Sequence, residues 1–192
     1  MRSKQDQGSF LTLASRSPQR RAILEQLGVG FTVVPAEITE INQGEPGEIA
    51  LLNATVKAGA VSASCVVGAD TVVALGEVIL PKPNDVAEAR LWLESLSGVT
   101  HEVFGGLCVN DRGQERGLLA RTLVTFRTLS KDDIEWYLAS GEWRDRAGGY
   151  AIQGRGAALV QVIEGEYLNV VGISVVNLLT LIPDLLQRFS NH

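Results

Sequence analysis

Cysteine, histidine and long apolar runs are scarce in this sequence, and each shortage excludes a class of protein. The two cysteines, Cys65 and Cys108, lie in separate apolar segments without a CxxC pair, which favours buried free thiols over a disulfide or a zinc site. The two histidines, His101 and His192, give little support to catalysis by a histidine base. No apolar stretch approaches the roughly 20 residues that a membrane-spanning helix requires, so no membrane partner is expected.

Surplus positive charge and the common catalytic motifs are missing as well. Lys and Arg number 17 against 22 Asp and Glu, a net charge of −5, so binding to a nucleic-acid polymer is not expected. P-loop, HExxH, GxSxG and zinc-type spacings do not occur. Residues 1–9 lack a signal-peptide core, and we expect a disordered tail there, followed by one cytoplasmic domain over residues 10–190.

A hydrophobic content of 45% and a charged content of 20% are ordinary for a globular domain, and the apolar periodicity predicts both helices and strands. The predicted helices span residues 18–27, 49–63, 85–97, 130–139 and 175–189, the last one bent or broken at Pro183. The predicted strands span residues 10–13, 31–34, 64–69, 101–110, 118–128 and 157–163. Because these elements mix without strict alternation, we expect an α/β fold: a single domain with a mixed, twisted central sheet flanked by helices, and a ligand cleft between two lobes.

The segment after the first predicted strand has the pattern of an anion-binding helix start. Ser17 can cap a helix and Pro18 suits its first position, where the missing N–H costs nothing. The first-turn amides then point outward unpaired at the positive end of the helix dipole. Arg16, Arg20 and Arg21 add charge and forked donors that match phosphate oxygens. The segment therefore predicts a site for a phosphorylated ligand.

A second group of polar residues follows the apolar strand predicted at 64–69. Asp70 and Thr71 stand at its carboxyl end, where open α/β sheets place their ligands. Lys82 lies between two prolines, which hold the backbone extended and present the ammonium at a fixed place. The alternative, that Asp70 caps a turn and Lys82 is a solvated loop residue, remains open on these residues alone.

A glycine-rich segment at 141–156 is typical of a loop that comes close to a ligand. In it, Gln153 offers a donor and an acceptor from one amide, which suits the imide edge of a pyrimidine base. Near the predicted phosphate site, Glu40 and Asp70 are the available acids, and Mg²⁺ prefers one or two carboxylates with phosphate and water oxygens. These residues indicate metal-assisted attack of water on a phosphate anhydride, with a carboxylate as proton acceptor.

Taken together, these segments resemble the Maf family of nucleoside triphosphate pyrophosphatases over residues 10–185. The matching blocks fall in the family's order and are Ser15–Arg20, Gly68–Val73, Lys82–Pro83, Leu96–Gly98 with His101 and Val103, Asp145–Gly154, Gly165 with Tyr167, and Asn169–Gly172. Each block alone is a weak signal, whereas their common register is a strong one.

The resemblance implies a cytoplasmic enzyme that cleaves a nucleotide between its α and β phosphates with the help of Mg²⁺ or Mn²⁺. It implies that Asp70 accepts the proton and binds the metal together with Glu40. Lys57 and Lys82 would surround the metal and the phosphates, and Arg20 would grip the phosphate chain. The residues that it places in substrate binding are Ser15, Ser17, Gln19, Arg20, Arg21, Thr71 and Gln153.

By the same resemblance, the choice of base depends on Gln19, Thr71 and Gln153. The Ala-Asp-Thr and Ile-Gln-Gly segments resemble the branch that acts on dTTP and UTP. Gln19, however, replaces the first arginine of the family's SPRR motif, as in the branch that acts on 7-methyl-GTP, and Arg146 replaces the usual lysine. A small-molecule nucleotide is the expected partner, and a homodimer is a family expectation only. Two alternative functions stay open: a pyrophosphatase of the same family that acts on 7-methyl-GTP or another modified nucleotide, and a nucleotide-binding regulator of cell division (septum formation) without significant catalysis.

Overall fold

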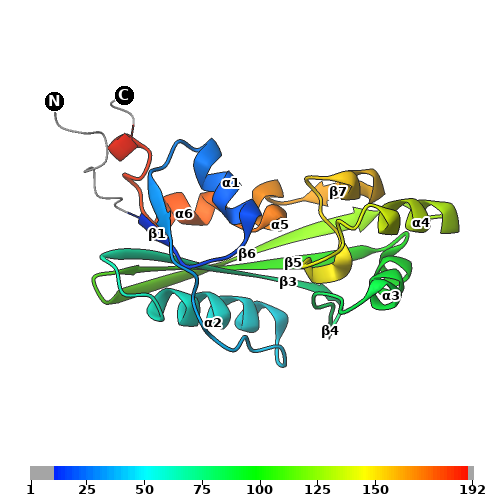
Figure 1. Ribbon diagram of the computed structural model, residues 1–192, viewed down its shortest axis with the longest axis horizontal. Coiled ribbons are helices and arrows are strands. Elements are labelled where there is room, and N and C mark those ends of the chain that lie inside the picture. The colour runs from blue at the N-terminus through cyan, green and yellow to red at the C-terminus, as the bar shows by residue number, and fades with distance from the viewer. Residues whose placement is uncertain (1–10, 190–192) are drawn as a thin grey trace.

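A mixed sheet of seven strands forms the centre of the computed structural model, which describes residues 11–189 (Figure 1). The strands are β1 (Leu11–Leu13), β2 (Phe31–Val33), β3 (Cys65–Leu75), β4 (Val78–Ile79), β5 (Thr100–Asp111), β6 (Gln114–Phe126) and β7 (Val160–Glu164). Their order is β2-β1-β3-β5-β6-β7, with β4 paired to β3. Because β1 pairs in parallel with β2 and β3 and the other pairs are antiparallel, the predicted mixed α/β sheet is confirmed. The tail expected at 1–9 lies outside the described residues.

Helices cover both faces of this sheet. They are α1 (Pro18–Gln26), α2 (Pro46–Gly59), α3 (Val86–Leu96), α4 (Lys131–Ala139), α5 (Tyr167–Val171) and α6 (Val175–Leu181). Figure 1 shows α2 on one face, and α1, α5 and α6 on the other. The α2 helix packs directly on the sheet, since a Cβ at Gly68 would lie only 2.1 Å from the carbonyl oxygen of Ala54. Glycine alone permits this approach, which brings the polar residues of α2 close to β3.

The β3 strand is longer than predicted, and this changes the setting of Asp70. It runs from Cys65 to Leu75 instead of ending at residue 69. Its start pairs with β1 and nearly its whole length with β5, so Asp70 lies inside the strand. The prediction that the strand stops at this acid is wrong, because a lysine and an amide from α2 satisfy the carboxylate in place of water.

Other boundaries also differ from the prediction. The strand predicted at 118–128 begins earlier, at Gln114, so it forms one continuous hairpin with the strand before it; the turn lies at Arg112 and Gly113, whose φ angles are 52° and 87°. The predicted C-terminal helix is too long, since α6 ends at Leu181, but the predicted break near Pro183 is confirmed. The short elements β4 and α5 were not predicted, because so few residues carry no readable periodicity.

Two large hydrophobic cores lie along the sheet and form the two lobes expected from the sequence, and two smaller clusters lie between α2 and the sheet. One packs α1 and α6 against β1 and the adjacent ends of β3 and β5, and buries Leu13, Leu24 and Leu178 fully. The other packs α3, α4 and the glycine-rich loop against the opposite part of the sheet, around Leu93 and Phe126. Within residues 11–189, no helix has both the length and the apolar surface that crossing a membrane demands.

Candidate active site

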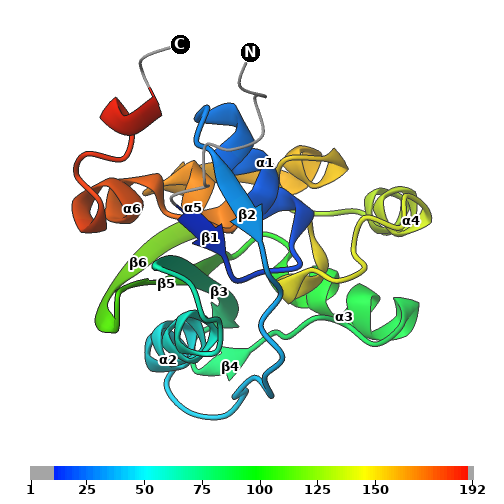
Figure 2. The ribbon, with the colours of Figure 1, turned by 60° about the vertical axis from the view of Figure 1, so that its left-hand side comes forward.

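A polar cavity of about 870 Å³ opens beyond the C-terminal end of β1, between the two cores. The chain leaves β1 through α1 on one side of the sheet and reaches the neighbouring β3 through α2 on the other (Figure 2). Open α/β sheets bind their ligands at such a switch in direction. The walls come from the β1–α1 turn, the loop after β2, α2, β3, the Lys82 segment, the glycine-rich loop and the α5–α6 junction. The volume suits a small-molecule ligand.

The β1–α1 turn is held by its own serines. Ser17 caps α1 as predicted, since its hydroxyl accepts from the N–H of Arg20 at 3.4 Å. The N–H of Ser17 in turn donates to the hydroxyl of Ser15 at 3.1 Å, and the Ser17 hydroxyl donates to Gln19 at 3.1 Å. The expectation that the amides of this turn are unpaired is therefore only partly correct. These hydrogen bonds fix the conformation of the turn, and both serines line the cavity.

Arg20 joins three parts of the cavity wall. Its guanidinium donates to Ser15 at 3.3 Å, to the Thr71 hydroxyl at 3.1 Å and to the Gly172 carbonyl at 3.0 Å. Burial lowers the pKa of Arg20, although the charges of Asp70 and Glu40 act against this shift, and an arginine stays protonated in either case. Because these three neutral partners use only part of its five N–H groups, Arg20 keeps charge and donors for an anionic ligand.

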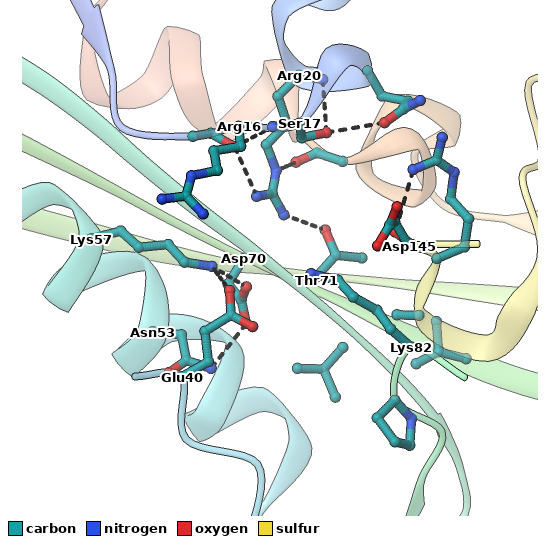
Figure 3. Close-up of a pocket in the computed structure, with 18 of the residues that line it drawn as sticks. Arg16, Ser17, Arg20, Glu40, Asn53, Lys57, Asp70, Thr71, Lys82 and Asp145 are labelled. Atoms are coloured by element: carbon teal, nitrogen blue, oxygen red, sulfur yellow. Dashed lines mark hydrogen bonds and ion pairs between the residues drawn. The ribbon is translucent and has the colours of Figure 1, made fainter. Parts of the chain in front are cut away.

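Opposite this turn, one lysine holds two carboxylates (Figure 3). The Lys57 Nζ lies 2.6 Å from Asp70 Oδ1 and 2.6 Å from Glu40 Oε1. The side chains of Lys57 and Asp70 are 9% and 10% exposed, whereas that of Glu40 is 45% exposed. Partial burial would raise the pKa of Glu40, but the hydrogen bond and charge of Lys57, helped by Lys82 and Arg20, hold it below its ordinary value. Both acids are thus arranged to act as carboxylates beside the cavity.

Lys82 approaches the cavity from a third direction, as Figure 3 shows. The preceding residue Pro81 also lines the cavity. The N–H of Leu80 donates to the carbonyl of Val73 in β3, and the carbonyl of Leu80 accepts from the N–H of Gly148 in the glycine-rich loop, each at 2.8 Å. Within residues 11–189, no carboxylate lies within ion-pair distance of the Lys82 ammonium. The prediction of a lysine presented at a fixed place therefore agrees with the geometry, and its charge is free to meet a ligand.

The cavity gathers most of the residues singled out in the sequence, but not all of them. Those that line it are Ser15, Ser17, Gln19, Arg20, Glu40, Lys57, Asp70, Thr71 and Lys82. Arg21 does not line it and pairs instead with Glu25 at 2.7 Å, because adjacent helical residues point about 100° apart and Arg20 faces inward. Gln153 is exposed and also lies outside the lining, because the buried run Tyr150–Ile152 carries the chain away from the cavity first. The structure therefore does not bring Arg21 and Gln153 together with the other predicted residues, and their contacts with a ligand stay predictions.

Sequence reasoning missed other residues that reach the site. Asn53 of α2 lines the cavity one helical turn before Lys57, a spacing that could have indicated a shared face. From the glycine-rich loop, Arg144 lines the opposite wall together with Asp145 and Arg146, which the family resemblance had included without giving them a role in the site. Asp145 has a φ of 59°, which aspartate tolerates better than most residues but which no local pattern predicted.

His101 lies outside the cavity and packs in the core behind it. It is 1% exposed, and its Nε2 lies 2.8 Å from the hydroxyl of Tyr150, whose own position borders the cavity. Burial lowers the pKa of His101 to about 4, so the ring is neutral near pH 7. This agrees with the expectation that the chemistry of the site rests on carboxylates and cations.

The acids present fit a magnesium or manganese ion of the kind that a nucleotide brings with it. Among residues 11–189, no group of three or more His, Cys, Asp and Glu forms a metal cage. Glu40 and Asp70 nevertheless converge on one point, Lys57 Nζ, and both line the cavity. Mg²⁺ is commonly held by one or two carboxylates, with phosphates and water completing its shell. The donor set matches that requirement.

Fold and site together define an α/β protein built to hold a small phosphorylated molecule between a Ser-Arg turn and a lysine-bridged pair of acids. The comparison with protein families agrees with this class. The model described as Maf-like protein matches residues 10–185, and the chain belongs to the Maf-like family.

Curated relatives are similar over most of their length and carry the name dTTP/UTP pyrophosphatase. The protein of that name from Deinococcus radiodurans is 44% identical over 88% of this chain and 90% of its own. The one from Myxococcus xanthus is 46% identical over 86% of this chain and 87% of its own. That from Pyrococcus furiosus is 44% identical over 90% of this chain and 93% of its own.

Proposed function

We propose that this protein is a nucleoside triphosphate pyrophosphatase that hydrolyses dTTP or UTP to the monophosphate and pyrophosphate. The observation that carries the proposal is the arrangement of Asp70, Lys57 and Glu40 across one cavity from the Ser-Arg turn. Substrate identity comes from the relatives named dTTP/UTP pyrophosphatase, which share more than two fifths of their residues with this chain.

The distribution of charge in the cavity supports the binding of a polyphosphate. The protein as a whole is acidic, yet basic residues line the cavity from four separate segments: Arg16 and Arg20, Lys57, Lys82, and Arg144 with Arg146. The acids Glu40 and Asp70 share Lys57, whereas Lys82 forms no ion pair within the described residues. Cations concentrated in a partly enclosed site attract an anionic ligand and hold it in one orientation.

The chemical step follows from the position of Asp70. A water molecule between this carboxylate and the α phosphorus gives its proton to Asp70 as its oxygen bonds to phosphorus. The bond from the α phosphorus to the bridging oxygen then breaks, and the bridging oxygen leaves with pyrophosphate. Arg20 and Lys82 stabilise the charge on the phosphate oxygens during this step. The proton held by Asp70 returns to solvent or to the product.

Glu40 and Asp70 would hold the divalent cation, Mg²⁺ or Mn²⁺, that we propose as the cofactor. When bound, such an ion neutralises phosphate charge and polarises the bond that breaks. We also keep two expectations that the family suggests, a cytoplasmic location and a homodimer, as parts of this proposal.

A panel of nucleotides assayed for pyrophosphate release with Mg²⁺ or Mn²⁺ tests the proposal. It contains dTTP, UTP, the other common triphosphates and 7-methyl-GTP, since Gln19 matches the branch that acts on the last of these. We expect dTTP and UTP to give the highest kcat/KM. Asp70→Asn should lower kcat by about 10²–10⁴-fold, the usual contribution of a positioned general base, while dTTP still binds by calorimetry.

Asp132→Asn, at an exposed site in the first turn of α4, is the matched control and should leave kcat unchanged. A preference for 7-methyl-GTP would replace the substrate assignment but keep the reaction. Tight nucleotide binding without turnover by the unmodified protein would support the alternative of a nucleotide-binding regulator and refute the hydrolase.

A further inference from the structure

A buried amide without an assigned role connects the two acids of the site. Asn53 of α2 is 3% exposed. Its Oδ1 accepts from the N–H of Ile41 at 2.9 Å, and its Nδ2 donates to the carbonyl of Ile41 at 2.9 Å and to Asp70 Oδ2 at 3.1 Å. An asparagine amide has two N–H groups, so these contacts account for both of them.

The backbone of Ile41 fixes which way this amide points. The N–H of Ile41 needs an oxygen opposite it and its carbonyl needs a donor, so turning the Asn53 amide over would lose both bonds. The Nδ2 atom therefore has to face Asp70. The backbone of Ile41, which takes no part in the reaction, thus determines that Asn53 is the donor in its hydrogen bond to the Asp70 carboxylate.

The spacing along α2 makes Asn53 and Lys57 a pair. Residues four apart on a helix project from the same face, and both of these reach Asp70. Lys57 Nζ contacts Oδ1 and Asn53 Nδ2 contacts Oδ2, so each oxygen of the carboxylate receives one donor from α2. Two donors at fixed positions fix the plane of the carboxylate as well as its location.

The same amide also holds the second acid in place. Glu40 precedes Ile41 directly, so the two backbone bonds from Asn53 anchor the loop that carries Glu40 against α2. The charged groups that face the acids are Lys57 from α2, Glu40 from this loop, Arg20 from α1, and Lys82, whose charge acts on Glu40. Asn53 is the neutral group that contacts Asp70 directly and holds the Glu40 loop through the backbone of Ile41.

We propose that Asn53 is a positioning residue for the reaction: it fixes the orientation of the Asp70 carboxylate and, through the backbone of Ile41, the position of the loop that carries Glu40. The inference rests on the proposed function, because it assigns Asp70 the role of proton acceptor. Asn53 acts through Asp70 and through the Glu40 loop, and takes up no proton itself.

Steady-state kinetics of Asn53→Ala with dTTP and Mg²⁺ give the first test. We expect kcat to fall by about 10–100-fold with KM within about threefold, as for the loss of one hydrogen bond to a charged group. Asn53→Asp, which keeps the shape but places an oxygen against Asp70 in place of a donor, should lower kcat at least as much, again with little change in KM.

Thr55→Ala on the same helix is the matched control. It removes the hydrogen bond from Thr55 to the Leu51 carbonyl without touching an acid, so it should lower stability and leave kcat and KM unchanged. Wild-type kinetics in Asn53→Ala, or an equal loss of kcat in Thr55→Ala, would overturn the positioning role. The substrate panel on the unmodified protein decides the proposed function separately.

A second measurement needs neither turnover nor the folding of an Asn53 variant. In NMR spectra of the unmodified protein, the side-chain amide of Asn53 should exchange slowly with water, and Asp70→Asn should shift its signals strongly. Unchanged Asn53 signals in that variant would show that the amide does not bond to Asp70, and would refute the inference.

Discussion

Replacing Lys57 by methionine tests how much the shared lysine stabilises the site and the fold. The substitution keeps most of the side-chain volume but leaves Asp70 buried and Glu40 half-buried without the ammonium that lies 2.6 Å from each. Removing one partner of a buried ion pair typically costs about 3–5 kcal/mol. The side chain of Glu40 is 45% exposed, so its contact with Lys57 adds little to stability. We therefore expect Lys57→Met to lower the free energy of unfolding by about 3 kcal/mol. For a domain of this size that loss lowers Tm by roughly 6–12 °C.

Thermal and urea unfolding at pH 7 measure the loss, with Lys131→Met as the matched control at an exposed position of α4. The control should stay within about 0.5 kcal/mol of the unmodified protein. The deficit of Lys57→Met should shrink as the pH falls, because Glu40 loses the Lys57 contacts that lower its pKa and therefore takes up a proton more readily in the variant. An unchanged Tm, or a deficit that does not depend on pH, would refute this account of the cluster.

Three further predictions concern the acid range and the packing. Burial lowers the pKa of His101 to about 4, so below about pH 6.5 the histidine binds a proton in the unfolded chain but not yet in the folded one. The unmodified protein therefore loses stability between about pH 6.5 and 4. His101→Phe should lose less over the same range, as measured by urea midpoints. Lys57 and other cations outweigh burial and lower the pKa of Glu40, so this carboxylate stabilises the fold above its ordinary pKa, and the stabilisation is lost as the pH falls through the pKa of the folded protein. Glu40→Gln should therefore flatten the profile of stability against pH in the acid range. It should also raise the Mg²⁺ concentration needed for turnover. Gly68→Ala should prevent stable folding, because its Cβ would meet the backbone of α2; circular dichroism should then show no cooperative unfolding transition. In the control Gly76→Ala, the new Cβ meets nothing within 4 Å, so the free energy of unfolding should fall by only about 1 kcal/mol, because of the φ of 60°.

Local chemistry explains which parts of the fold could be predicted. The start of α1 depends on a capping hydroxyl and a proline within three positions of one another, and the structure begins the helix at Pro18 with Ser17 as its cap. The mixed sheet likewise followed from the irregular succession of helical and strand periods. Both signals lie within a few residues of the structure that they predict.

The errors arise where distant residues decide the outcome. The strand that contains Asp70 continues because Lys57 and Asn53 arrive from a helix earlier in the chain, and no pattern around residue 70 reports their presence. Arg21 was placed in the site with Arg20 because both lie in the first turn, although the helical angle between them already separates their directions. Gln153 was placed by its amide chemistry, and the buried residues before it decide where the chain emerges.

The bond between the Gly148 N–H and the Leu80 carbonyl has a consequence for how this site could change its preference for ligands. It ties the loop that carries Arg146 to the segment that carries Lys82, whereas Asp70 sits on a long strand hydrogen-bonded to β5. The sheet therefore holds Asp70 on both sides of its position in β3, whereas the segments that carry Arg146 and Lys82 are joined to each other by this bond. Exchanging the glycine-rich loop with that of a relative would preserve activity only if residues 80–83 were transplanted with it.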